Sequence, residues 1–211
     1  MVGARYFHPT AEIESGVFIG TGTALWSYVH LRGPNTVLGE NCIIGERTYV
    51  GYGVEIGDRV KINAGVYICT GVTIASGVLV GAGVVFTNDR YPRATTPDLT
   101  ELRSSAPDAH TLLTRVEEGA TIGAGSVVGC DLTIGRFAMV GMGAVVTRSV
   151  APFHLAVGQP ARSVGIVSRA GEPLLRFSGA RPPDRELLTC PSSGLRYAVR
   201  DGSVEELDPP A

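Results

Sequence analysis

The sequence predicts an all-β protein, a parallel β-helix, from a six-residue period and from a glycine pattern locked to that period. Aliphatic or aromatic residues recur at every sixth position over residues 38–86 and again over 116–146. Glycine directly follows many of them, as at Gly39, Gly45 and Gly123. A helix repeats about every 3.6 residues and an ordinary strand every 2, so neither explains the pattern. Each hexad should therefore form one short side of a coil, with three hexads to a coil.

The period divides the chain into a β-helix domain over residues 1–165 and a tail over 166–211. The expected segments are a lead-in (1–12), a first run of coils (13–87), an inserted loop (88–115), a second run of coils (116–150), a proline-rich connection and an irregular tail with a hairpin around Leu195–Leu207.

The early repeats are out of phase with the later ones. The anchors Leu25 and Leu38 are thirteen residues apart, one more than two hexads, so a corner near Gly33–Asn35 should absorb an extra residue. Beyond that point, side chains eighteen residues apart should stack from coil to coil. By this rule Tyr52, Thr70 and Asn88 share one corner.

Composition limits which cellular compartment and which classes of binding partner are expected. The 18 Lys and Arg residues against 20 Asp and Glu residues give a net charge of −2, which does not favour binding to nucleic acid or an anionic membrane. No segment resembles a signal peptide or a membrane span, so a cytoplasmic protein is expected. The isolated cysteines favour core packing over disulfides or metal binding. They are Cys42, Cys69, Cys130 and Cys190.

The inserted loop is expected to carry function. Residues 88–115 lack the period and contain three prolines and four arginines. Long irregular segments within a regular fold are usually functional or disordered, and repeat proteins place them on one face, often the binding face.

The repeats and the closing stretch Ala156–Arg162 (AVGQPAR) resemble the hexapeptide-repeat acyltransferases, whose coils wind into a left-handed parallel β-helix. Three local segments are similar to those of the nucleotide-linked 3-amino-sugar N-acetyltransferases. They are Leu25-Trp26 with Val29-His30, Val85–Asp89 running into Tyr91–Arg93, and Gly119–Gly123. This resemblance implies a homotrimer, with acetyl-CoA as co-substrate in the groove between adjacent subunits.

The substrate that the resemblance implies is a dTDP- or UDP-linked 3-amino hexose. Cys69-Thr70 stands where relatives acting on uronic acid sugars often carry an aromatic–acidic pair, and the loop also differs from the common forms. A dTDP-3-amino-3,6-dideoxyhexose is therefore slightly preferred over a UDP-3-amino uronic acid.

Acyl transfer from a thioester to an amine needs a neutral amine, stabilisation of the tetrahedral oxyanion and a route for the proton. Asn88, where the hexads break, is the first choice to orient the amine, and Asp89 could accept a proton or cap the turn. The corners at Gly123–Ala124 and Gly141 could offer backbone N–H groups to the CoA arm. From the family ending, Pro160 and Arg162 are expected beside CoA, with Arg162 on a phosphate.

A histidine base is the alternative proton route, since histidine is the residue most often used in this role. His30 and His110 are the candidates, while some relatives need no side-chain base because the departing thiolate can take the proton. Arg90 and Arg93 could bind the diphosphate, and Tyr52 could stack on the nucleobase.

Three other functions compete with N-acetylation. O-acetylation of a sugar or xenobiotic would depend on a histidine base, because a hydroxyl is a weaker nucleophile than an amine. A zinc-dependent carbonic anhydrase needs converging histidines, and no two histidines here share a close spacing. A non-catalytic structural β-helix would explain the repeats but neither the loop nor the AVGQPAR ending.

Overall fold

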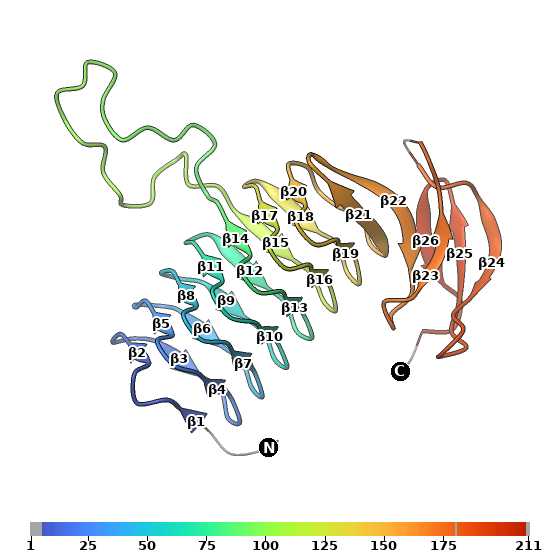
Figure 1. Cartoon of the computed structure of the whole chain (residues 1–211), viewed down its shortest axis with the longest axis horizontal. Coiled ribbons are helices and arrows are strands. Elements are labelled where there is room, and N and C mark those ends of the chain that lie inside the picture. The colour runs from blue at the N-terminus through green and yellow to red at the C-terminus, as the bar shows by residue number, and fades with distance from the viewer. Residues whose placement is uncertain (1–5, 180, 210–211) are drawn as a thin grey trace.

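A computed structural model describes residues 6–179 and 181–209, and these form a parallel β-helix followed by a small C-terminal sheet (Figure 1). Three sheets form the sides of the β-helix. The first contains, in spatial order, β1 (Tyr6–Phe7), β4 (Ala24–Leu25), β7 (Ile43–Ile44), β10 (Lys61–Ile62), β13 (Leu79–Val80), β16 (Thr121–Ile122), β19 (Met139–Val140), β21 (His154–Gly158), β22 (Ala161–Val167) and β23 (Pro173–Arg176). The second contains β2 (Glu12–Ile13), β5 (His30–Leu31), β8 (Tyr49–Val50), β11 (Tyr67–Ile68), β14 (Val85–Phe86), β17 (Val127–Val128) and β20 (Val145–Val146). The third contains β18 (Leu132–Ile134), β15 (Thr114–Val116), β12 (Val72–Ile74), β9 (Glu55–Ile56), β6 (Val37–Leu38) and β3 (Phe18–Ile19).

The period of six arises because each hexad gives two side chains to the interior. In the hexad that contains β10, Val60 and Ile62 are both buried, and Lys61 between them is exposed. A short coil cannot bury this face alone, so stacking of the coils makes one continuous apolar core. The all-β prediction and the parallel β-helix are confirmed.

The corner glycines are required by close contact between coils. A Cβ added to Gly45 would lie 2.5 Å from the carbonyl carbon of Asn63 in the next coil. The positive φ angles fall two residues later, and there a side chain is tolerated: Gly53 has a φ of 62° and Arg47 one of 55°. The glycine that directly follows a strand is therefore required by close packing between coils, and not by a positive φ.

The extra residue lies where the sequence predicts it. Glu12 pairs with His30 eighteen residues on, but His30 pairs with Tyr49 nineteen residues on. From Val37 the spacing to the next coil returns to eighteen. This change of spacing confirms the extra residue. The corner between contains a cis Gly33–Pro34 bond and Asn35 with a φ of 66°.

Two expectations at the ends of the chain need correction. The coils begin earlier than residue 13, because β1 in the expected lead-in pairs in parallel with β4. The tail contains the expected hairpin, because β25 (Arg196–Arg200) and β26 (Ser203–Glu206) pair in antiparallel orientation. The rest of the tail is not irregular, since β24 (Arg185–Thr189) adds a third strand to this antiparallel sheet. The expected boundary between residues 165 and 166 falls inside β22, which joins the β-helix to the tail.

The tail sheet has a core of its own. Buried side chains from the end of the β-helix and from the tail pack together there: Phe153, Ile166, Cys190, Tyr197 and Val199. Two apolar clusters rather than one therefore stabilise the chain, and the second attaches the tail to the last coil.

The inserted loop leaves the β-helix between β14 and β15 and extends far from it (Figure 1). Arg103 holds its two arms together. Its guanidinium lies 3.5 Å from the carboxylate of Asp89 and 3.8 Å from that of Asp108, and donates to the carbonyl oxygen of Tyr91.

Three of the four cysteines lie in the two cores, and Cys130 is half-buried outside them. Cys42 and Cys69 are buried in the β-helix and Cys190 in the tail, and all four thiols are free. The described residues include no helix with the length and apolarity that crossing a bilayer requires.

Candidate active site

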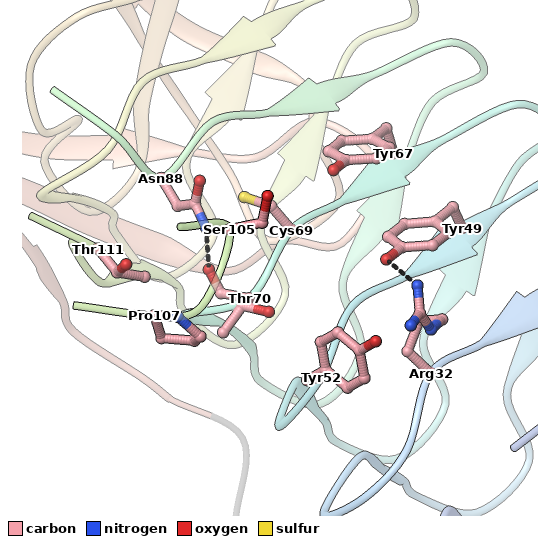
Figure 2. Close-up of a pocket in the computed structure, with 10 residues that line it drawn as sticks. All are labelled: Arg32, Tyr49, Tyr52, Tyr67, Cys69, Thr70, Asn88, Ser105, Pro107 and Thr111. Carbon is pink, nitrogen blue, oxygen red and sulfur yellow. Dashed lines mark hydrogen bonds between the residues drawn. The ribbon is translucent and has the colours of Figure 1, made fainter. Parts of the chain in front are cut away.

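A cavity of about 450 Å³ lies where a corner of the β-helix meets the inserted loop (Figure 2). The coils provide one wall and the loop the other. The lining residues are Arg32, Tyr49, Tyr52, Tyr67, Cys69, Thr70, Asn88, Ser105, Pro107 and Thr111. Residues far apart in sequence meet here because the coils stack and the loop folds back onto them.

Asn88 is fixed in orientation at this corner. Its side-chain Nδ2 donates a hydrogen bond to the carbonyl oxygen of Thr70, at 3.1 Å, in the coil before it. Tyr52, one coil further back, lines the same cavity, so the predicted stack of Tyr52, Thr70 and Asn88 is confirmed. Because Nδ2 is engaged, the Oδ1 of Asn88 remains to accept a hydrogen bond from a ligand N–H.

Arg32 lies at the other end of the cavity, among aromatic rings (Figure 2). Its guanidinium lies 4.3 Å from the ring centre of Tyr52, and its Nη1 donates to the hydroxyl of Tyr49 at 3.2 Å. Tyr49 in turn stacks on Tyr67 with ring centres 5.0 Å apart. Arg32, Tyr49 and Tyr67 were not among the expected site residues. Tyr49 and Tyr67 are eighteen residues apart, so the stacking rule could have found that pair.

His30 is not a lining residue of this cavity. Its Nε2 lies 3.1 Å from Glu14, and its Nδ1 lies 3.8 Å from Glu12. Both ring nitrogens therefore face carboxylates, and the ring contacts the cavity only through the edge of Tyr49. The backbone N–H of Gly33, more than any other group, holds the pKa of Glu14 below its ordinary value.

A second cavity, of about 370 Å³, continues from Asn88 into the loop. Asp89 and Arg93 line it, as the sequence suggests, but both already have partners. Asp89 accepts a hydrogen bond from the backbone N–H of Tyr91 at 2.7 Å, in the manner of a turn-capping residue. Arg93 donates to the carbonyl oxygen of Pro92.

Arg90 and His110 line neither of these two cavities, as far as the described residues show. Arg90 pairs with Asp131 across the corner. The backbone N–H of His110 donates to the carboxylate of Asp108 at 2.7 Å, and the residue is exposed in the loop. The loop folds so that its arginines mainly contact the protein itself.

Two groups in the first cavity, Cys69 and Tyr67, have a raised pKa that favours their protonated forms. Burial raises the pKa of the Cys69 thiol to about 12. Burial, together with the neighbouring Tyr49, also raises the pKa of Tyr67 above its ordinary value. A thiol with so high a pKa is a poor nucleophile near neutral pH, so Cys69 is unsuited to form an acyl intermediate.

At the expected Gly123–Ala124 and Gly141 corners, the N–H groups of the two glycines already have partners. The N–H of Gly123 bonds to the carbonyl oxygen of Val140, and that of Gly141 bonds to Ala156, each at 2.8 Å. Both glycines are also required for packing, since a Cβ on Gly123 would lie 2.5 Å from the nitrogen of Met142. Within the described chain, the next N–H groups along, at Ala124 and Met142, make no hydrogen bond and remain as donors.

The closing stretch AVGQPAR forms the turn between β21 and β22. The Gln159–Pro160 peptide bond is cis, and the side chain of Gln159 donates to the carbonyl oxygen of Gly143 at 2.7 Å. Arg162 is exposed at the start of β22 and lines a cavity of about 190 Å³ together with Arg148. Two guanidinium groups in one cavity form a site suited to phosphate.

The arrangement can orient a ligand amine at Asn88 and bind anions at Arg32 and at Arg148 and Arg162. Within the described residues no group of three or more His, Cys, Asp or Glu side chains is placed to hold a metal ion.

Comparisons with known proteins agree with the repeat pattern. The family model described as the hexapeptide repeat of succinyl-transferase matches residues 35–70 and 114–148. The model described as bacterial transferase hexapeptide (six repeats) matches residues 53–88.

One curated relative is 39% identical over 94 residues, which is 44% of this chain and 45% of that protein. It is the dTDP-3-amino-3,6-dideoxy-alpha-D-galactopyranose 3-N-acetyltransferase of Aneurinibacillus thermoaerophilus. The match thus spans less than half the length of that relative.

A solved structure shares the fold, and a second was compared with this chain. A mutant of AntD, an N-acyltransferase from Bacillus cereus in complex with dTDP and coenzyme A, superposes with a TM-score of 0.52 at 15% identity, covering 80% of this chain and 86% of that one. The acetyltransferase domain of PglB from Neisseria gonorrhoeae, in complex with acetyl coenzyme A, superposes with a TM-score of 0.48 at 16% identity over 77% of this chain and 58% of that one.

Proposed function

We propose that this hexapeptide-repeat protein is an acetyl-CoA-dependent N-acetyltransferase that acts on the 3-amino group of a nucleotide-linked sugar. The preferred substrate is a dTDP-3-amino-3,6-dideoxyhexose. The observation that carries the proposal is Asn88, a fixed amide at the head of a cavity, in a chain 39% identical over 94 residues to an enzyme of that activity.

The reaction needs no covalent intermediate on the protein. The free amine attacks the thioester carbonyl carbon, a C–N bond forms, and the C–S bond breaks as the tetrahedral oxyanion collapses. The amine loses one proton, which the departing CoA thiolate takes. The products are the N-acetyl sugar and CoA.

Asn88 orients the amine in this mechanism. With Nδ2 bonded to Thr70, its Oδ1 accepts an N–H of the amine and directs the nitrogen lone pair away from itself. Among the described lining residues of the first cavity there is no carboxylate and no histidine, which supports direct attack by an amine that arrives unprotonated.

The same observation weighs against O-acetylation. A hydroxyl acceptor needs a general base, yet both ring nitrogens of His30 face carboxylates and His110 lies apart in the loop. N-acetylation is therefore the function that this cavity supports best.

CoA binds through its phosphates and its arm. Arg162 and Arg148 bind phosphate, with Pro160 shaping the turn beside them. The N–H groups of Ala124 and Met142 contact the arm or the developing oxyanion, with Gly123 and Gly141 allowing close approach.

A trimer would complete the site. Asn88 follows a strand of the second sheet, whereas Ala124 and Met142 follow strands of the first sheet, so they lie at different corners of the β-helix. One chain does not bring both corners onto one acetyl group. Packing of adjacent β-helices around a three-fold axis would let the amine corner of one subunit face the CoA corner of the next.

A thiol-release assay with acetyl-CoA tests the function directly. The acceptors would be dTDP- and UDP-linked 3-amino and 4-amino hexoses, a UDP-3-amino uronic acid and the matching hydroxy sugars. We expect turnover of a dTDP-linked 3-amino sugar. Turnover confined to a hydroxy sugar would overturn N-acetylation, and absence of both turnover and CoA binding would favour a structural role. Light scattering should report a trimer, and a stable monomer would overturn the shared site.

A further inference from the structure

Arg32 is held in place by three neighbours at the end of the first cavity opposite Asn88. Its Nε pairs with Glu14 at 2.5 Å, its Nη1 donates to Tyr49, and its guanidinium packs over the ring of Tyr52. The side chain is 28% exposed. A long cation that is already ordered loses little conformational freedom when it binds a ligand.

The guanidinium still has donors to offer. It carries five N–H groups, of which one on Nη1 bonds to Tyr49. Nε is buried and lies 2.5 Å from Glu14 as an ion pair, but makes no hydrogen bond among the described residues. Within the described part of the chain, the N–H groups of Nη2 are not used in a hydrogen bond. Glu14 neutralises the charge of Arg32 only in part, because the carboxylate of Glu14 also contacts His30 and accepts a hydrogen bond from the N–H of Gly33.

The charge of the cavity favours an anion at Arg32. Arg32 is the one charged residue among the ten described residues that line this cavity. The arginines that the sequence suggests for a diphosphate are otherwise engaged: Arg90 pairs with Asp131, and Arg93 lies in the loop cavity and bonds to Pro92. We propose that Arg32 binds the diphosphate of the nucleotide-linked substrate, an assignment that rests on the function proposed above.

The spacing of the corner fits this assignment. Tyr52 and Asn88 are two coils apart, which corresponds to about 10 Å at the usual separation of neighbouring strands. The Arg32 guanidinium packs on Tyr52, so a hexose lies between the cation and the amide. The sugar-linked phosphate then meets Arg32 while the 3-amino group meets Asn88.

Binding of dTDP and of thymidine, measured by calorimetry, tests the proposal without any chemical step. Arg32→Gln should weaken dTDP binding by about 10- to 100-fold, the loss expected for a charge-assisted pair, and leave thymidine binding unchanged. Arg32→Lys should lose part of the affinity, because it keeps the charge but not the planar fork. Arg185→Gln, on the exposed strand β24, is the matched control and should bind both ligands like the wild type.

Each other result overturns the proposal in a distinct way. Unchanged dTDP affinity in Arg32→Gln, in an enzyme that acetylates a nucleotide sugar, would reject Arg32 and leave the function standing. A loss of dTDP affinity in Arg93→Gln instead would show that the diphosphate binds to the inserted loop, at Arg93, and not at Arg32. Equal losses for dTDP and thymidine in both Arg32 variants would mean that Arg32 shapes the cavity only. A wild-type protein that binds acetyl-CoA but no nucleotide, and turns over no nucleotide sugar, would reject the function itself.

Discussion

The side-chain amide of Asn88 is bonded to the backbone of Thr70, in the neighbouring coil, so its carbonyl oxygen has a fixed direction. A regular stack of coils thereby positions a functional group at the point where the stack is interrupted. The orientation depends on two residues eighteen positions apart, and substitutions can test each part of it.

Asn88→Ala should lower kcat by about 100-fold, a loss typical of a misplaced reacting group, with little change in the KM for acetyl-CoA. Steady-state kinetics with both substrates would measure this. Asn63→Ala, at another corner of the β-helix, is the matched control and should behave like the wild type. Equal losses in kcat and in CoA binding would remove Asn88 from the chemistry.

Replacing His30 or His110 by Ala should lower kcat for an amino sugar by less than about 10-fold, below the usual contribution of a general base. The physical reason is that neither imidazole lines the cavity at Asn88. A pH–rate profile would provide a second measure, since loss of a base would remove a limb of the profile. A decrease of 100-fold or more in either variant would identify a histidine base and favour O-acetylation.

Arg162→Ala should raise the KM for acetyl-CoA by about 10-fold while kcat changes little, because a charge-assisted phosphate contact is lost. Arg148→Ala should act in the same direction, since both residues line one cavity. Arg200→Ala, at the exposed end of strand β25 in the tail, is the comparison. An unchanged KM in both variants would place CoA elsewhere.

Glu206 attaches the tail to the β-helix. Its carboxylate is 4% exposed and pairs with Arg136 from the last coils and with Arg169. Glu206→Gln should lower the free energy of unfolding by about 1–3 kcal/mol, because two arginines, one of them 40% exposed, lose a charged hydrogen-bond acceptor. Glu205→Gln next to it removes only an exposed pair with Arg200, and should cost at most about 1 kcal/mol. Urea unfolding of both variants would compare them, and equal effects would contradict the role of Glu206.

Stability should fall at alkaline pH because of Cys69. Below pH 9 the thiol is protonated in the folded and the unfolded chain, so it has no effect on stability. Between pH 9 and about 12 the unfolded chain releases this proton and the folded chain retains it, which favours unfolding as the pH rises. Relative to a Cys69→Ser variant, the wild type should lose about 1 kcal/mol more between pH 8 and pH 10. Parallel pH dependence in the two proteins would contradict the raised pKa.

Much of the fold and part of the candidate site could be predicted because neighbours in a β-helix are separated by a constant number of residues. The stack of Tyr52, Thr70 and Asn88 and the extra residue near Pro34 follow from counting. The corners themselves were predicted, but which of their N–H groups already have partners could not be found in this way. A glycine in the sequence does not reveal that its N–H already bonds to the next coil, as it does at Gly123.

The sequence by itself determined the β-helix, its corner stack and the position of the inserted loop, because a period of six makes the contact between coils a matter of sequence distance. Only the tertiary structure decided which polar groups are free. In the folded chain both ring nitrogens of His30 face carboxylates, and Arg90 pairs with Asp131. The guanidinium of Arg32 packs on the ring of Tyr52 in the next coil. Long side chains reach between coils in directions that no repeat encodes, and their ion pairs form wherever an opposite charge lies within reach.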